Sequence, residues 1–376
     1  MSGWSARTMR GLLVALYGAI KLVTRPRANK IVFLGRRMDR MPLDFRLLMD
    51  EVRRREPGIE TVVISRLVKG DSNELFTFVP LLVRSMYHLA TARVAVLDSY
   101  WPTVSMLNHR GSLTVYQLWH SLGKIKQSGK QAIGRAGGRS AEVARAMRMH
   151  EGYDYVVAGA EVWNPFYRAS FGVDDAQILN LGQPRADYLL HDRDRVAARI
   201  RSAYPRLGRD KPVVLYVPTF RRGERGTGAL KLATALDLDR YDLVIKKHDS
   251  DDLLEPPQAH FTCDEFTGTQ LLTVADYIVT DYSSIALEAA ILDVRTFYFL
   301  YDYEHYLANN GVNIDLYAEM PGCVFQRADE LVGAIDGVYP DDVLAAYKRK
   351  FLFPDPGHST RDLTDHIFEV GGLCRR

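Results

Sequence analysis

The sequence predicts an α/β protein made of two doubly wound domains, each with a parallel sheet covered by helices on both faces. Short runs rich in Val, Ile, Leu and Tyr recur between stretches that are long enough to form helices. These runs are continuously apolar rather than alternating, which is typical of parallel strands buried on both faces. They fall into two series separated by the charged stretch 190–211. Two such series indicate two domains.

The strands and domain bounds follow from these runs. The first series predicts strands over 30–35, 60–65, 93–98, 112–120, 153–159 and 177–182. The second series predicts strands over 212–218, 241–248, 276–281 and 295–300. We therefore expect an N-terminal segment (1–29), a first domain (30–190), a second domain (191–357) and a C-terminal helical segment (358–376) that packs back on the first domain. A chain of 376 residues fits two domains, at about 100 to 200 residues each.

The N-terminal end is strongly basic. Residues 1–55 hold 13 Lys and Arg against 4 Asp and Glu, a net charge of +9, which leaves −6 for the rest of the chain. Arg7, Arg10 and Lys21 flank the apolar run 12–20, which is shorter than the roughly 18 residues of a membrane span. Two alternatives remain: a helix lying on an anionic membrane surface, or an ordinary helix packed on its own domain. In either case we expect no transmembrane span.

Polar side chains follow most of the predicted strands at the point where each strand ends. In open α/β sheets, ligands bind beyond the carboxyl ends of the strands. The residues at these ends are His120, Arg185, Thr219, Arg221, Lys246, His248, Thr280, Asp281, Ser283 and Ser284. Because the set is rich in cations and hydroxyl groups, the sequence predicts an anionic ligand between the two domains.

The stretch VTDYSSIALE (279–288) predicts a strand that turns directly into a helix. Asp281, Ser283 and Ser284 are residue types that cap a helix N-terminus, and the free N–H groups of a first helical turn bind anions. Glu288 lies four residues after Ser284, where its carboxylate could bind a ribose hydroxyl if phosphate occupied the helix start. The alternatives are a capped helix that binds nothing and a salt bridge of Glu288 on the helix face.

Three further strand-end residues have the side chains that phosphoryl chemistry needs. His120 directly follows an apolar strand, where a general base is expected, although a histidine there also serves structural roles. His248 stands beside Lys246 and Lys247, which favours phosphate binding. Arg221 has a planar guanidinium group that can bind a phosphate through two hydrogen bonds.

A second basic stretch surrounds His120. Residues 108–150 contain eight Lys and Arg and a single acid, Glu142. Lys124, Lys126 and Lys130 would attract anionic lipid headgroups and an acceptor that carries a diphosphate. Nucleic acid is the rival partner for such a patch, but recognised binding motifs are absent and few aromatics are interleaved. We therefore predict no nucleic-acid partner.

Several common signatures are absent from the sequence. It has no Gly-x-Gly-x-x-Gly, Walker, Gly-x-Ser-x-Gly or His-Glu-x-x-His motif, which argues against dehydrogenases, P-loop ATPases, serine hydrolases and zinc proteases. Its three cysteines are scattered and lack zinc-site spacing, as expected in a reducing, cytoplasmic setting. We predict no required cofactor and no protein metal site, and Mg²⁺ on a donor diphosphate remains an open alternative.

Six motifs together resemble those of the CDP-glycerol glycerophosphotransferase family, the primases and polymerases of teichoic acids. They are LWHSLGKIKQSGKQ, LGQPRADYLL, VLYVPTFR, IKKHD, VTDYSSIALEAAILDVRTFYFLYDYEHY and NNGVNIDL, in the family's order and at similar spacing over about residues 110–370. The resemblance implies a GT-B-like fold of two Rossmann-type domains whose parallel sheets face a central cleft. It also implies a peripheral enzyme on the cytoplasmic membrane face that transfers glycerol phosphate from CDP-glycerol to a lipid-linked saccharide acceptor and releases CMP.

The resemblance also implies roles for individual residues. His120 is similar to the family's histidine proposed as base, and His248 to a second histidine near the donor diphosphate. The residues that would bind the diphosphate are Arg221, Lys246, Thr280, Ser283 and Ser284, with Thr219, Arg185 and Asp281 in support. Glu288 would lie near the nucleotide ribose.

Three departures from the family pattern bear on the donor. Trp-His-Gly reads Trp-His-Ser at 119–121, Lys-x-His-Pro reads Lys-Lys-His-Asp at 246–249, and Arg-Gly-x-Tyr reads Asn-Asn-Gly-Val-Asn at 309–313. The third change removes a cation, so CDP-ribitol or another polyol donor stands beside CDP-glycerol. The length resembles that of primase-like members. The alternatives are a GT-B glycosyltransferase that uses a nucleotide sugar and a non-catalytic donor-binding scaffold.

Overall fold

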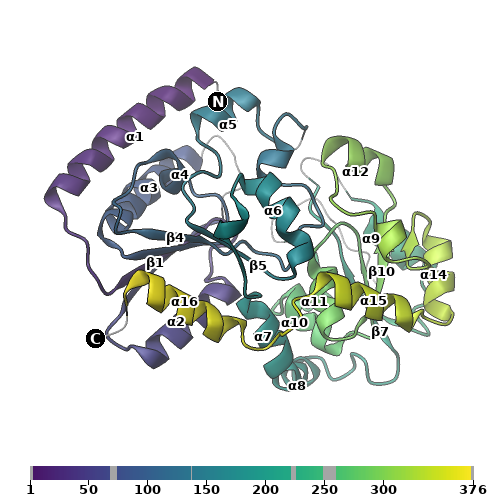
Figure 1. Ribbon diagram of the computed structural model, residues 1–376. Coiled ribbons are helices and arrows are strands. Elements are labelled where there is room, and N and C mark those ends of the chain that lie inside the picture. Colours follow the sequence, from purple (N-terminus) through teal and green to yellow (C-terminus); the bar gives the residue numbers. More distant parts are fainter. Residues whose placement is uncertain (1–2, 68–73, 137, 222–225, 249–259, 374–376) are drawn as a thin grey trace. The chain divides into compact units, whose positions relative to one another are not determined.

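The computed structural model describes residues 3–67, 74–136, 138–221, 226–248 and 260–373. The chain divides into two compact units (Figure 1). Unit 1 consists of Met1–His120, Ser128–Arg185 and His358–Arg376, and unit 2 of Ser121–Gln127 and Ala186–Gly357. Two details differ from the predicted bounds. Unit 2 starts at Ala186 rather than at 191, and it also takes the short segment 121–127 from within the first series of strands.

In the described part of unit 1, six parallel strands form a sheet in the order β2-β1-β3-β4-β5-β6. The strands are β1 (Lys30–Gly35), β2 (Glu60–Ser65), β3 (Val94–Leu97), β4 (Thr114–Gln117), β5 (Tyr155–Ala158) and β6 (Ile178–Asn180). Each strand of the first predicted series is present. From β1 the chain goes to β2 on one side and then to β3 on the other, so the switch point of this sheet lies between β1 and β3.

The helices of unit 1 cover this sheet. They are α1 (Gly3–Val23), α2 (Leu43–Arg55), α3 (Glu74–Thr91), α4 (Pro102–Met106), α5 (Ala141–Ala146), α6 (Asn164–Phe171) and α16 (Ser359–Gly371), with single turns at Gly129–Ala132, Glu161–Trp163 and Asp175–Gln177. α2 buries Phe45, Leu48, Met49 and Val52, which have the helical spacing of one apolar face. They form a core with strand residues and α16.

The C-terminal helix α16 lies beside α2 in unit 1 (Figure 1). Leu363 and Ile367 contribute to the shared core. The hydroxyl of Tyr116 in β4 lies 3.0 Å from Nδ1 of His366, and Arg93 donates from Nε to the carbonyl oxygen of Gly371 at 2.6 Å. These contacts attach a segment far away in the sequence to the first sheet.

The N-terminal helix α1 packs against α3, α4 and α5 in unit 1. Tyr17 is its buried anchor, and the Tyr17 hydroxyl lies 2.8 Å from Nδ1 of His109. The ring of His109 donates from Nε2 to the carbonyl oxygen of Val104 at 2.9 Å, so Nδ1 accepts from Tyr17. Among the helices that the structure describes, α1 included, none is both long and apolar enough to cross a membrane.

In the described part of unit 2, five parallel strands form a second sheet in the order β11-β10-β9-β7-β8. The strands are β7 (Val213–Val217), β8 (Asp242–Ile245), β9 (Tyr277–Thr280), β10 (Arg295–Phe299) and β11 (Val324–Phe325). The second predicted series is present, and β11 was missed because two residues carry no periodic signal. The switch point of this sheet lies between β7 and β9.

The helices of unit 2 form two groups of mutual contacts, α8 with α10, α11 and α15, and α9 with α14. The helices are α7 (Pro184–His191, which begins in unit 1), α8 (Arg193–Ala203), α9 (Gly228–Ala235), α10 (Gly268–Leu271), α11 (Ile285–Ile291), α12 (Tyr303–Asn309), α13 (Leu316–Glu319), α14 (Ala328–Asp336) and α15 (Asp341–Phe351), with a single turn at Leu272–Val274. The hydroxyl of Tyr188 in α7 accepts a hydrogen bond from Gln270 at 3.2 Å, which ties most of α7 to unit 2.

Candidate functional site

In unit 1, a strained corner at the carboxyl end of β4 places His120. Trp119 has a φ of +61°, a left-handed conformation that is costly for a bulky residue. The buried side chain of Gln117 holds this corner from both sides. Its Oε1 accepts from the backbone N–H of Trp119 at 3.0 Å, and its Nε2 donates to the carbonyl oxygen of Ser99 at 3.2 Å. The indole of Trp119 and the imidazole of His120 lie 4.1 Å apart between ring centroids.

The hydrogen bond of His120 defines its tautomer. Nδ1 of His120 lies 2.9 Å from the backbone carbonyl oxygen of Asp98. Because a carbonyl oxygen only accepts, Nδ1 must carry the proton. In the neutral ring, Nε2 is then the unprotonated nitrogen. Partly buried and held in this way, His120 has the geometry of a general base.

In unit 2, Asp281 links the ends of β7 and β9 at the switch point. Its side chain is completely buried and accepts from the backbone N–H of Thr219 at 2.9 and 3.0 Å. Nη1 of Arg221 donates to the same carboxylate at 2.5 Å. Asp281 therefore fixes the corner and does not cap α11.

Arg221 is buried in an ion-pair network, which corrects its expected role. Nε and Nη2 donate to Asp302 at 2.8 and 2.9 Å, and Nη1 donates to Asp281 and to the carbonyl oxygen of Thr219. Burial lowers the pKa of Arg221, but the two carboxylates outweigh it and raise the pKa above its ordinary value. The guanidinium also lies over the ring of Tyr301, with 5.3 Å to the centroid. Arg221 is 7% exposed and four of its five N–H groups are paired, so it braces this corner of the site.

The other hydroxyl residues at this corner differ in burial and in hydrogen bonding. Thr280 is fully buried and donates to the carbonyl oxygen of Val217 at 2.7 Å. Ser283 and Ser284 are partly buried. Ser284 occupies the N-cap position of α11 without a side-chain capping bond, while Oγ of Ser283 accepts weakly from the N–H of Ile285 at 3.4 Å. The two serines thus lie between β9 and α11, as predicted, but cap the helix poorly.

Thr219 carries an unpaired polar atom in the middle of this region. Its Oγ1 is buried and has no hydrogen-bond partner among the described residues. Buried hydroxyl groups in native proteins are nearly always paired. Since Thr219 directly follows the end of β7, its hydroxyl is a candidate contact for a ligand at the switch point.

Glu288 is buried in α11 rather than on an exposed helix face. It is 4% exposed, and its Oε2 accepts from the hydroxyl of Thr269 in α10 at 2.6 Å. A salt bridge on the helix surface, the alternative interpretation of this residue, is therefore incompatible with its burial.

Lys246 and His248 follow the end of β8 in unit 2, as predicted. Nζ of Lys246 donates to the carbonyl oxygen of Asp264 at 3.1 Å. The imidazole of His248 stacks on Phe220, with centroids 5.7 Å apart and planes 24° apart. Phe220 comes from the loop after β7, so the ends of β7 and β8 meet at this pair.

Arg185 has an ion-pair partner of its own, and the prediction for Lys124 needs correction. Arg185 belongs to unit 1, where its backbone N–H and its side chain donate to the buried carboxylate of Asp44. Lys124 is 2% exposed, and its burial moves its pKa well below the ordinary value. A buried lysine cannot contact a membrane surface.

The segment 121–127 is attached to the loop 309–313, a feature that sequence reasoning noted only as a family departure. Nδ2 of Asn313 donates to the carbonyl oxygens of Lys124 and Lys126 at 2.7 and 3.3 Å. The backbone N–H of Asn313 donates to Ile125 at 2.8 Å, and the N–H of Gln127 donates to Gly311 at 3.1 Å. Asn313 is thus the clamp of the segment that directly follows His120.

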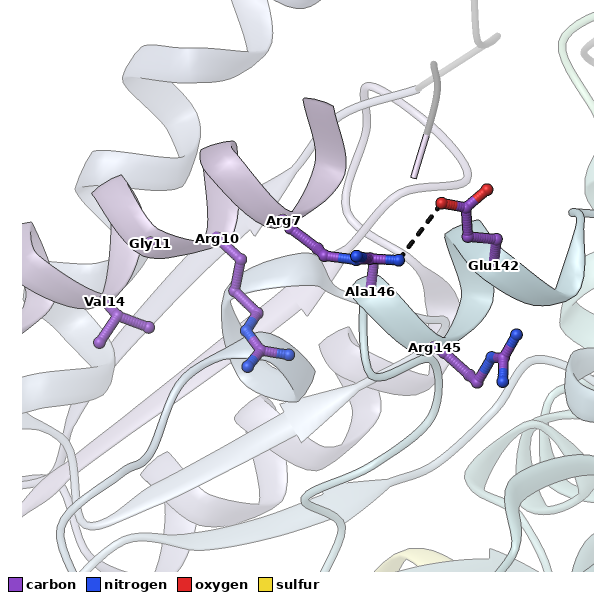
Figure 2. A pocket seen from close by; sticks show the side chains of 7 residues that line it. All are labelled: Arg7, Arg10, Gly11, Val14, Glu142, Arg145 and Ala146. Carbon is purple, nitrogen blue, oxygen red and sulfur yellow. Dashed lines mark hydrogen bonds and ion pairs between the residues drawn. The ribbon is translucent and has the colours of Figure 1, made fainter. Parts of the chain in front are cut away.

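The remaining basic residues lie in unit 1, apart from Lys126, which is partly buried in unit 2. Arg7 and Arg10 of α1 line a pocket of about 630 Å³ together with Glu142 and Arg145 of α5. Figure 2 shows Arg7 pointing at Glu142, 3.3 Å away.

The other two basic residues of this set have separate surroundings. Lys21 donates to the carbonyl oxygen of Asn108 at 2.8 Å, and Lys130 is partly buried beside Gly172. These residues do not form one continuous set of contacts.

Two parallel, doubly wound sheets, each with polar residues at its switch point, are typical of a GT-B-like α/β fold. The model of the CDP-glycerol:poly(glycerophosphate) glycerophosphotransferase family matches residues 16–369, and the chain belongs to this family. This match confirms the predictions made from the sequence: the resemblance to this family, the fold class and the assignment as a transferase. No group of three His, Cys, Asp or Glu suited to a metal ion occurs among the residues described here.

Named relatives and solved structures agree with this family. The chain is 26% identical over 386 residues to a teichoic acid ribitol-phosphate primase of Bacillus spizizenii, covering 98% of both chains. It is 23% identical over 295 residues to a teichoic acid glycerol-phosphate primase of Bacillus subtilis, covering 76% of each. A structure of the wall teichoic acid polymerase TagF soaked with CDPG superposes with a TM-score of 0.76 at 19% identity, covering 97% of both chains.

Proposed function

We propose that this protein transfers a polyol phosphate, ribitol phosphate or glycerol phosphate, from its CDP-activated form to a hydroxyl of a polyprenyl-diphosphate-linked saccharide. CMP leaves, and the product is a primed teichoic acid or a similar cell-wall polymer. Family membership supports the donor class. The primase that matches over 98% of both chains supports a primase-like role.

The observation that carries the proposal is the hydrogen bond from His120 to Asp98. It leaves Nε2 as the unprotonated ring nitrogen, so the ring can take a proton from an acceptor hydroxyl without first changing its tautomer. General-base catalysis of this kind contributes about 10²- to 10⁴-fold to the rate. The strained corner at Trp119 and the brace from Gln117 preorganise the ring.

Unit 2 would bind the donor. Lys246 and His248 are the cationic candidates for its diphosphate, and Ser283 and Ser284 offer hydroxyl and backbone N–H groups at the end of β9. Thr280 and Arg221 would act indirectly, by holding this corner in place. The buried carboxylate of Glu288 is the candidate for a ribose hydroxyl.

The reaction then needs one bond formed and one broken. The acceptor oxygen attacks the phosphorus that bears the polyol as its proton moves to Nε2 of His120. The bond from that phosphorus to the bridging oxygen breaks, and CMP leaves with the electron pair. Lys246 and His248 offset the charge on CMP, so positioning and electrostatics supply most of the catalysis.

We also propose that α1 attaches the protein peripherally to the cytoplasmic face of an anionic membrane. Apolar side chains recur along its exposed side: Leu12 at 69%, Leu16 at 41%, Leu22 at 88% and Val23 at 85% exposure. Basic residues stand at both ends of this stripe, including Arg7 and Lys21. An apolar stripe with basic flanks suits the headgroup layer of a membrane.

The test measures CMP release by the full-length protein in liposomes that contain a lipid-linked saccharide acceptor. CDP-glycerol and CDP-ribitol are compared, and His120→Ala is run beside the wild type. Release from one donor, lost in the variant, is the expected result and identifies the polyol. Release from neither donor, with folded protein bound to the liposomes, would overturn the proposal, and release of UDP from a nucleotide sugar would identify a glycosyltransferase instead.

A further inference from the structure

An arginine outside the predicted site, Arg36, lies at the switch point of unit 1. It directly follows β1, and Asp98 directly follows β3, so the two residues mark the two strands between which the sheet order reverses. Ligands of doubly wound sheets bind in the crevice at this point. The backbone N–H of Arg36 donates to Oδ1 of Asp98 at 3.3 Å. Gly35 makes this approach possible, because a Cβ there would lie 2.8 Å from Oδ2 of Asp98.

Arg36 and His120 are held by the same three residues of backbone. The carbonyl oxygen of Asp98 accepts from His120 at 2.9 Å, that of Ser99 from Gln117 at 3.2 Å, and that of Tyr100 from Nη1 of Arg36 at 3.2 Å. Carbonyl groups two residues apart lie at most about 7 Å from each other along a chain. The guanidinium of Arg36 and the imidazole of His120 are therefore both anchored on the short segment 98–100 that follows β3.

The charge of Arg36 is only partly offset within the described part of the protein. Among the described residues it forms no ion pair with a carboxylate, and its Nε is buried without a hydrogen-bond partner. Its guanidinium lies over the ring of Tyr100, 5.8 Å from the centroid. Burial lowers the pKa of Arg36 and the positive charge of Arg139 lowers it further, while Tyr100 and the carboxylate of Asp98 offset part of this change. A partly buried cation whose Nε is shielded from solvent, beside a second cation, is unfavourable unless an anion joins it.

We propose that Arg36 binds a phosphate oxyanion of the acceptor next to the hydroxyl that His120 deprotonates. This inference rests on the proposed function and names the acceptor class more closely. A phosphate near the attacking hydroxyl occurs where the acceptor ends in a polyol phosphate, and a neutral saccharide end lacks it. A guanidinium suits this task because it offers several N–H donors in a fixed plane. Arg36 thereby selects acceptors that already carry one polyol phosphate.

The test compares two lipid-linked saccharides in liposomes, one ending in glycerol phosphate and one ending in the bare sugar, with the full-length protein. Arg36→Gln should raise KM for the phosphate-ended acceptor by about 10- to 100-fold, the worth of a charged hydrogen bond, and should leave the bare acceptor unaffected. Arg36→Lys should recover part of the loss. Arg46→Gln removes an exposed arginine of α2 and is the matched control. An unchanged KM in Arg36→Gln would overturn the inference.

The phosphate could instead belong to the donor, and a binding measurement separates the two sources. CDP-glycerol and CDP-ribitol are titrated into wild type and Arg36→Gln without acceptor, and sn-glycerol 3-phosphate serves as the probe of the acceptor end. Weaker binding of glycerol 3-phosphate alone supports the inference, and weaker binding of the CDP donor alone overturns it. This arm needs no turnover, so it still tests Arg36 if CMP release fails and the proposed function falls.

Discussion

His120 and Asp98 are joined by a hydrogen bond of 2.9 Å from Nδ1 to the backbone carbonyl oxygen. The two residues follow neighbouring parallel strands, β4 and β3. The bond orients the imidazole and presents Nε2 as the proton acceptor.

His120→Asn should separate this orienting bond from the base. The asparagine amide can still donate to Asp98, but it offers no nitrogen that takes a proton. We expect an intact fold, unchanged binding of the CDP donor and a loss of about 100-fold or more in kcat. Rates of CMP release at saturating donor and acceptor provide the measurement. A variant with kcat close to that of the wild type would remove His120 from the chemistry.

Arg221→Met should destabilise unit 2, because it leaves the buried Asp281 and the partly buried Asp302 without their cation. Breaking a buried ion pair from one side costs about 3–5 kcal/mol. Chemical denaturation followed by far-UV circular dichroism gives the change in unfolding free energy. Arg201→Met, at an exposed arginine of α8, is the control. If both variants unfold at the same denaturant concentration, the network contributes little.

Asn313→Asp should lower kcat while leaving donor affinity unchanged. Asn313 donates to Lys124 and Lys126, and a carboxylate would instead face two carbonyl oxygens. Losing such a buried donor costs about 1–3 kcal/mol. The segment that it loosens directly follows His120 in the chain, so the base should be less well placed. Asn310→Asp in the same loop is the control, and equal kcat in the two variants would argue against the clamp.

Leu16→Glu combined with Leu22→Glu should weaken binding to anionic vesicles by about tenfold or more, since each exposed leucine contributes roughly 1.5–3 kcal/mol when fully buried. Co-sedimentation with vesicles of anionic and neutral lipid measures the effect. Leu230→Glu alters a leucine of α9 in unit 2 that is 61% exposed, and provides the control. Membrane binding that is the same in all three proteins would exclude α1 as the attachment site.

Acid should release α1 through His109. Burial lowers the pKa of His109 to about 4 from an ordinary value of 6.5. The folded state therefore binds fewer protons than the unfolded state between these values, so its stabilising contribution is complete above pH 6.5 and is lost as the pH falls toward 4, at up to about 1.4 kcal/mol per pH unit. Unfolding free energies across this range are the measurement. His109→Gln should flatten the dependence, and an unchanged slope would assign it to other groups.

The sequence by itself determined the two sheets and the strand ends that matter. Continuous apolar runs are a local signal, since a strand buried on both faces must be apolar at every position. The position of His120 and of the corner after β9 followed from the same signal, because parallel strands bring their carboxyl ends to one edge. Among the strands that the structure describes, β11, which has two residues, was not predicted.

Tertiary structure alone decided which polar groups are free. The sequence suggests Arg221 as a phosphate ligand, but in the fold Asp281 and Asp302, both far along the chain, accept hydrogen bonds from it. Lys124 is expected to be exposed from its residue type, but the fold buries it. The sequence does not distinguish Arg36 from the other arginines; the strand order places it on the backbone segment that also holds His120. Pairing and burial depend on contacts between residues distant in sequence, and the free energy of a charged group is set by those neighbours rather than by its own residue type.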